Sequence, residues 1–406
     1  MNRRQFLGGA ILIGSVAAAD GTSAAVALSP ASQGSAPLPF HGKHQAGITT
    51  PAQSRLLFAS YDVLTNDRQE LIGVLQEWTS AARRMTEGRP VGTDNTDQDA
   101  PPDDTGEADG LGPAALTVTF GLGASLFDKP GDPFTIVARK PAALVAMPTF
   151  AGDELDPARS DGELAVQACA EDPTVCFHAI RNLTRIERGV VALRWSQSGF
   201  GRTSSTDTAQ TTPRNLMGFK DGTNNLVAED TAALERHVWV GASDDPAWMR
   251  GGSYLVTRRI RMLLEVWDRS TLADQEATIG RVKGNGAPLT STKEHDAVHL
   301  SATRAGEPVI PARAHIRLAA PEENDGTRLL RRGYSFTDGI DPVTDQLDAG
   351  LFFVAYQRDP RTGFIRVQER LRTDALNEYI RHTSTAMFAC PPGVDPGGYV
   401  GETLFA

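Results

Sequence analysis

The feature that most constrains the fold is the order of short β-prone runs and helical stretches along the chain. In the first half, apolar residues alternate with polar ones in four runs and recur at helical spacing in two others. We therefore predict strands at 54–63, 116–120, 164–169 and 190–195, and helices at 71–85 and 173–187. The order is strand–helix–strand, followed by strand–helix–strand.

The second half repeats this order without any residue-level repeat. We predict strands at 253–266, 333–336 and 351–357, a helix at 270–279, and a segment from Pro360 or Thr362 to His382 whose apolar positions are Phe364, Val367, Leu371, Leu376 and Ile380. Such units predict an α+β protein of two ferredoxin-like halves with antiparallel sheets packed together. A cofactor cleft is expected between sheet and helices of the second half.

The amino terminus has the layout of a bacterial signal peptide. Arg3 and Arg4 precede Phe6 and Leu7, and an uncharged run rich in glycine and alanine extends to Ala19. The paired arginines are similar to the twin-arginine signal. Cleavage after Ala19 or after Ala27 fits the pattern of small residues, and we assign residues 1–27 to the signal peptide.

The composition of the remaining residues indicates a linker, two folded halves and a long loop. Residues 28–52 are predicted to be a linker and N-terminal segment, because 28–39 is rich in Ser, Pro and Ala. The two ferredoxin-like halves are assigned to 53–205 and 206–406. The acidic stretch 86–113, with Gly and Pro throughout, is predicted to be a long surface loop.

Charge and cysteine content exclude several classes of protein. The formal net charge of −10 argues against a nucleic-acid partner, which requires a basic surface. Three cysteines are no disulfide framework for 406 residues. Cys169 and Cys176 are predicted to lie two turns apart on one helix, too far apart for a bridge.

The stretch from Asn215 to Asn225, NLMGFKDGTNN, is the most informative part of the chain. Its composition predicts a loop in which two glycines flank a carboxylate, Asp221, and let the backbone approach a ligand closely. A glycine-rich turn with a capping aspartate is the alternative. Neither a P-loop nor a dinucleotide-binding pattern is present.

Several stretches resemble the dye-decolourising peroxidase family. Gly218-Phe219-Lys220-Asp221-Gly222 matches that family's GxxDG motif, and the run to Asn225 resembles its secreted, twin-arginine-exported deferrochelatase/peroxidase subgroup. Four further stretches are similar in order along the chain, at 40–48, 116–121, 194–201 and 251–256. The resemblance covers about residues 40–406 and implies one haem b per chain, bound in the cleft of the second half.

The resemblance assigns roles to three side chains. His315 is implied as the proximal ligand of the haem iron, and Asp221 and Arg331 as the catalytic pair on the opposite side, with Arg332 as the alternative to Arg331. Aspartate has an unperturbed pKa of about 3.9 and histidine about 6.5, so an aspartate base implies an acidic optimum.

Other haem contacts are implied at three places along the chain. The family's pattern places them at Gly222, Thr223 and Asn224, at Ala320, Pro321 and Glu322, and at Arg331. The subgroup often has Asn-Pro-Arg where this chain has Ala320-Pro321-Glu322. A basic contact to a haem propionate at residue 322 is therefore absent here, and another basic side chain is expected to replace it.

The implied activity is reduction of hydrogen peroxide with oxidation of bulky phenolic or dye-like reductants. The alternative is a haem-handling protein that carries haem or releases its iron, and a haem-free binding module is a third class.

Implied partners are the twin-arginine translocase, iron-uptake components and a second copy of the chain, with a periplasmic or extracellular location. Because a large dye cannot enter a haem cleft, we expect surface aromatic residues to relay electrons, with these candidates: Tyr334, Trp267, Trp239 and Tyr356.

Overall fold

The computed structural model describes residues 36–92 and 97–406. The predicted signal peptide, 1–27, lies outside the described residues, as does the first part of the segment 28–52. Within the described ranges, no helix combines the length and the apolar character needed to cross a membrane.

The first half has the predicted order of elements. It consists of β1 (Arg55–Val63), α1 (Arg68–Thr86), β2 (Thr117–Gly123), β3 (Leu164–Ala170), α3 (Pro173–Ile186) and β4 (Val191–Arg202). The four strands pair antiparallel in the order β2-β3-β1-β4, which is the ferredoxin-like order. Both helices begin at an aspartate N-cap, Asp67 and Asp172, whose side chains accept backbone N–H groups.

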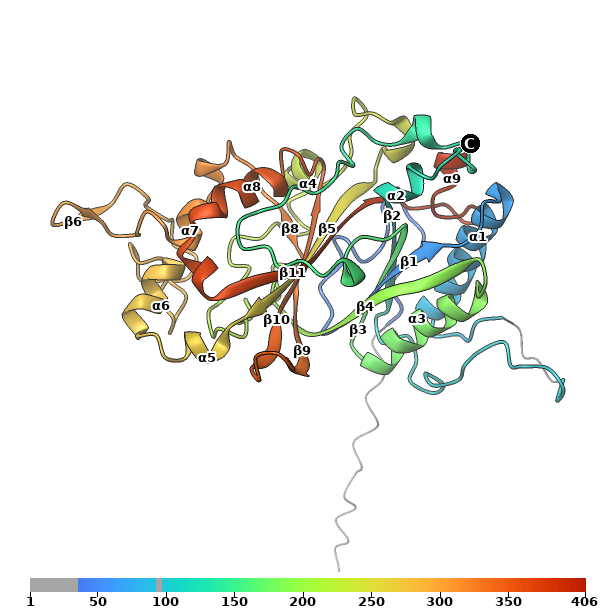
Figure 1. The fold of residues 1–406 in the computed structure, drawn as a ribbon, viewed down its shortest axis with the longest axis horizontal. Helices are drawn as coiled ribbons and strands as arrows, with labels where there is room; N and C mark the ends of the chain where they lie inside the picture. The colour runs from blue at the N-terminus through green and yellow to red at the C-terminus, as the bar shows by residue number, and fades with distance from the viewer. Residues whose placement is uncertain (1–35, 93–96) are drawn as a thin grey trace, which may run out of the picture. The chain divides into compact units, whose positions relative to one another are not determined.

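The second half repeats this topology (Figure 1). Its elements are β5 (Ser253–Met262), α6 (Leu272–Ile279), β9 (Tyr334–Ile340), β10 (Leu347–Gln357), α8 (Phe364–Arg370) and β11 (Ile380–Cys390). The strand order is β9-β10-β5-β11, again all antiparallel. The expectation of two ferredoxin-like halves is therefore confirmed.

The two sheets are also joined to each other at both edges. β4 pairs with β9, and β11 pairs with β2, so the eight long strands form one closed sheet. Closure removes the unpaired N–H and C=O groups that the edge strands of two separate sheets would expose. Aromatic side chains fill the space between the sheets, with the Phe58 ring 5.5 Å from Phe352 and 6.0 Å from Phe388.

Three local expectations were wrong. The strand expected at 253–266 ends at Met262, and a short helix α5 (Leu264–Trp267) follows. The segment from 360 to 382 divides into α8 and the start of β11, with two 3₁₀ turns between them. Cys169 lies on β3 and Cys176 on α3, so they do not share a helix, and all three cysteines are free and buried.

Candidate active site

A cavity of about 550 Å³ lies in the second half of the chain, between the outer face of its sheet and the helices that cover it. Ile260, Leu351 and His382 line it from β5, β10 and β11, and α7 (His315–Leu318) and α8 line it from the other side. Every site residue expected from the sequence lines this one cavity: Asp221, Gly222, Thr223, Asn224, His315, Ala320, Pro321, Glu322 and Arg331.

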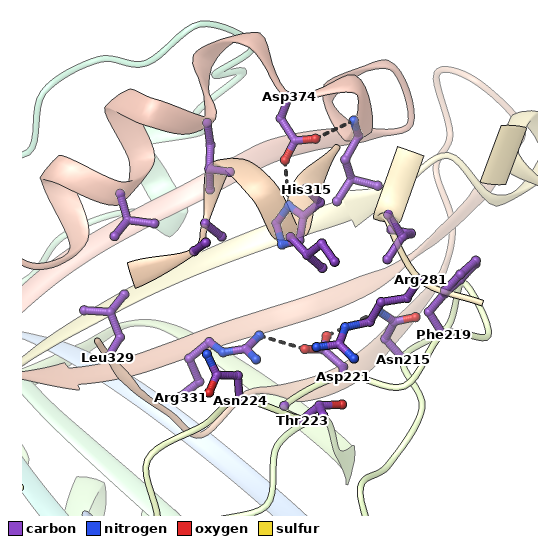
Figure 2. A pocket seen from close by; sticks show the side chains of 18 of the residues that line it. Asn215, Phe219, Asp221, Thr223, Asn224, Arg281, His315, Leu329, Arg331 and Asp374 are labelled. Carbon is purple, nitrogen blue, oxygen red and sulfur yellow. Dashed lines mark hydrogen bonds and ion pairs between the residues drawn. The ribbon is translucent and has the colours of Figure 1, made fainter. Parts of the chain in front are cut away.

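His315 is held from behind by a carboxylate. Its Nδ1 lies 2.6 Å from Oδ2 of Asp374, whose side chain is only 3% exposed. The other oxygen of Asp374 accepts the backbone N–H of Leu376 at 2.9 Å, which fixes the carboxylate. Nδ1 is thereby occupied, and the imidazole points into the cavity with Nε2 facing the open space (Figure 2).

Burial and the Asp374 carboxylate act on His315 in opposite directions. Desolvation favours the neutral imidazole, but the charge of Asp374 and its hydrogen bond together outweigh it and raise the pKa of His315. The histidine–carboxylate pair therefore makes the imidazole a stronger base than an isolated buried histidine. Sequence reasoning missed Asp374, because it lies in an irregular segment 59 residues after His315.

Asp221 and Arg331 lie on the opposite side of the cavity from His315 (Figure 2). Nη1 of Arg331 donates to Oδ1 of Asp221 at 2.7 Å, and Nδ2 of Asn215 donates to Oδ2 at 3.2 Å. The Asp221 side chain is 14% exposed and that of Arg331 is 29% exposed. A carboxylate and a guanidinium thus face the free nitrogen of His315 across the open space.

The loop that carries Asp221 depends on a glycine and on an asparagine. Gly222 has a φ of +86°, and a Cβ there would approach Cα of Ser204 to 2.8 Å, so a larger residue does not fit. The buried Asn225 amide accepts the backbone N–H of Arg331 and donates to its carbonyl, both at 2.8 Å. This pair of bonds ties the loop to β8 (Leu330–Arg331), and hence Asp221 to Arg331.

Only one of the two adjacent arginines lines the cavity. Arg332 is fully buried and donates to the backbone carbonyl of Thr50 and to Gln53, and it does not line the cavity. Arg331, one residue earlier, points to the other face of the strand and into the cavity. The side-chain alternation of a strand explains why only one of the pair reaches the site.

Two further polar groups in the wall are buried and incompletely paired. Arg258 forms an ion pair with Asp153, but its Nε and Nη1 have no hydrogen-bond partner, and neither has Nδ1 of His382. Both side chains line the cavity. Desolvation, and then the charge of Arg258, lower the pKa of His382 to about 3, so its imidazole is neutral at physiological pH.

Other histidines lie apart from this arrangement. His44 stacks on Trp239 with ring centroids 3.7 Å apart, and it does not line the cavity. His295 is at the cavity but 72% exposed, whereas His299 does not line it. No group of three or more His, Cys, Asp or Glu side chains in the described ranges could hold a metal ion by itself.

The four aromatic relay candidates are not surface residues. Tyr334 and Tyr356 are completely buried, and Trp267 and Trp239 are 1% and 4% exposed. Of these four residues, only Trp267 connects the cavity with a more exposed aromatic ring. Its ring lies 5.9 Å from Phe219, which lines the cavity, and 4.9 Å from Tyr379, which is half-buried.

Comparison with known proteins gives consistent results for both halves. A family model for "Dyp-type peroxidase, N-terminal" matches residues 45–201, and one for "Dyp-type peroxidase, C-terminal" matches residues 212–395. The deferrochelatase of Escherichia coli strain K12 is 37% identical over 372 residues, which is 90% of this chain and 86% of that protein.

Solved structures agree with this result. Ferric DtpA from Streptomyces lividans is 41% identical, with a TM-score of 0.83 over 92% of this chain and 98% of that chain. The DyP-type peroxidase from Cellulomonas bogoriensis is also 41% identical, with a TM-score of 0.81 over 91% and 98%. The chain therefore belongs to the Dyp-type peroxidase family.

Proposed function

We propose that this protein is a haem b peroxidase that reduces hydrogen peroxide and oxidises bulky phenolic or dye-like compounds. The observation that carries the proposal is the Asp221–Arg331 pair facing Nε2 of His315 across one cavity. A proton acceptor and a cation on one side, and an iron ligand on the other, are the groups that peroxide cleavage at a haem requires.

The cavity fits a haem group in size and chemistry. Its volume of about 550 Å³ lies within the usual range of ligand and cofactor sites, ~300–1,000 Å³. Its walls present apolar side chains suited to the faces of a porphyrin, among them Ile260, Leu351, Phe353, Val367 and Leu371. When bound, haem supplies the iron at which peroxide binds and is reduced.

His315 would bind the iron through Nε2. Asp374 holds Nδ1–H, which sets the tautomer and the direction of the ring and increases electron donation by the imidazole. The remaining lining residues expected from the sequence would surround the haem edge, at 222–224 and 320–322.

Asp221 would move the proton on the opposite side. Its carboxylate can take a proton from one peroxide oxygen and deliver it to the other, which becomes the leaving oxygen. Arg331 donates to Oδ1 and keeps this carboxylate facing the open space. The same guanidinium stabilises negative charge that develops on the leaving oxygen.

Bulky reductants would be oxidised away from the cavity. Trp267 and Tyr379 connect the cavity-lining Phe219 with a half-buried position, and both have oxidisable rings. We place the electron route there, because the other three aromatic candidates have no such connection.

Export is the part of the proposal that rests on the first residues alone. Arg3 and Arg4 support transport of the folded, haem-loaded protein by the twin-arginine translocase to the periplasm or the extracellular space. Replacing both by lysine should leave haem-loaded precursor in the cytoplasm, and normal export of this variant would exclude the route.

A haem-handling role is the second candidate, with iron-uptake components as partners. The name of the Escherichia coli relative, deferrochelatase, favours it. The Asp221–Arg331 pair favours the peroxidase, because carrying haem requires only the ligand. Purified protein should show a Soret band and oxidise a phenol with hydrogen peroxide. Iron-free porphyrin fluorescence without phenol oxidation would instead support iron release.

A further inference from the structure

The basic side chains around the cavity are not equally neutralised. Among the described residues, five lysine and arginine side chains line it. Three of them form ion pairs with carboxylates: Lys220 with Glu294, Arg258 with Asp153, and Arg331 with Asp221. The other two, Arg281 and Arg328, line the cavity and form no such ion pair with any residue that the structure describes.

Arg281 and Arg328 differ in how their donors are used. Nη1 of Arg281 donates to the backbone carbonyls of Gly286 at 2.7 Å and Glu294 at 3.0 Å, so this side chain is part of the wall. Arg328 makes one weak hydrogen bond, from Nη2 to the carbonyl of Asn225 at 3.3 Å, and its buried Nε has no partner. A guanidinium has five N–H donors, and leaving buried donors unpaired is costly.

A bound haem would offer Arg328 one kind of charged acceptor. It lies three residues before Arg331, and its contact with Asn225 holds it where the loop 222–225 meets β8. The propionates are the only charged groups on the periphery of haem b. A guanidinium binds a carboxylate with two parallel hydrogen bonds, which is the strongest pairing available to both groups.

Glu322 has the opposite charge at the same cavity. Its side chain is exposed, lines the cavity, and forms no ion pair in the described part of the chain. A carboxylate there repels a propionate. The cavity therefore needs a cation elsewhere to neutralise the haem carboxylates.

We propose that Arg328 binds a haem propionate and that Glu322 opposes this binding. The inference rests on the proposed haem site, because it assigns the partner of a group on that cofactor. Arg328 is thus a binding residue that sets how firmly haem is held, whereas Asp221 and Arg331 act on peroxide.

The first experiment measures transfer of haem from the loaded protein to excess apomyoglobin. Arg328→Gln should release haem about 10- to 100-fold faster than the wild type, because a charge-assisted pair is lost. Arg328→Lys should be intermediate, and Glu322→Gln should release haem more slowly. Arg236→Gln is the matched control, since Arg236 is exposed on α4 (Thr231–His237) and does not line the cavity.

The second experiment repeats the transfer with haem dimethyl ester, which has no propionate charge. Wild type and Arg328→Gln should release the ester at the same rate. Equal acceleration for haem and ester would overturn the proposal, because Arg328 would then act only on the structure of the cavity. Unchanged release of haem by Arg328→Gln would overturn it as well, and a wild type without a Soret band would instead refute the haem site itself.

Discussion

Asp374 is the residue whose charge acts most directly on His315. Asp374→Asn would keep a hydrogen-bond acceptor for Nδ1–H but remove the negative charge 2.6 Å away. The imidazole then donates less electron density, so the ferric state is less stabilised and the reduction potential of the haem should rise.

Spectroelectrochemical titration of the haem-loaded protein measures this change. Asp325→Asn, on an exposed side chain paired with Arg366, serves as the control and should leave the potential unchanged. An unchanged potential in Asp374→Asn would mean that Asp374 does not tune the ligand.

His382 makes stability depend on pH. Its pKa is about 3 in the folded protein and about 6.5 in an unfolded chain, so below pH 6.5 only the unfolded chain binds this proton. Stability is therefore lost as the pH falls from 6.5 toward 3. The charge of the Arg258 guanidinium, which is paired with Asp153, also opposes protonation of this imidazole.

Replacing His382 by Gln should remove this loss. As the pH falls from 7 to 5, the wild type should lose about 2 kcal/mol of unfolding free energy that the variant keeps. Urea unfolding at both pH values measures this difference. The exposed His299→Gln should show no such gain. A parallel pH dependence of wild type and His382→Gln would show that the buried imidazole is not responsible.

The link between the loop 221–225 and β8 positions Asp221 beside Arg331. Asn225→Ala would leave the buried N–H of Arg331 without its acceptor, at a cost of about 1–3 kcal/mol. We also expect a slower reaction of the haem-loaded variant with hydrogen peroxide, because Arg331 and Asp221 lose their common support. A lower melting temperature with an unchanged reaction rate would assign Asn225 a structural role only.

Helices and strands whose apolar residues recur at a regular spacing could be predicted from the sequence, and elements without such a spacing could not. α1 and α3 have apolar faces and aspartate caps, and both were found within a few residues. β11 was missed because it is buried over almost its whole length and so lacks alternation of apolar and polar residues. β8 is only two residues long, and pairing with β10 defines it rather than its own composition.

The residues of the candidate site divide in the same way, into those that a sequence pattern reveals and those that only the folded chain brings together. A contiguous motif revealed Asp221 and its neighbours, and resemblance identified His315 and Arg331. Asp374 and Asn225 act through contacts made only in the folded chain, 59 and 106 residues away in sequence. Burial of the four aromatic relay candidates follows from tertiary packing, which their identity as Trp or Tyr does not reveal.

Closure of the sheet was not predictable, because edge strands pair through backbone groups that are the same in every sequence.

On the proposed function, large substrates are oxidised at the surface through Trp267 and Tyr379. Trp267→Phe and Tyr379→Phe should each lower turnover of a bulky dye while leaving the peroxide reaction of the haem unchanged. Tyr334→Phe is the buried control. Undiminished dye turnover in both variants would exclude this route.

On the proposed function, Asp221 and Arg331 together promote cleavage of peroxide on the side of the cavity opposite His315. Stopped-flow mixing of haem-loaded protein with hydrogen peroxide at acidic pH, followed at the Soret band, tests it most directly. Asp221→Asn and Arg331→Leu should keep haem and react more slowly, and loss of a general base typically costs ~10²–10⁴-fold. If both variants bind haem and react as fast as the wild type, the catalytic assignment is wrong, and haem carriage or iron release is the better account.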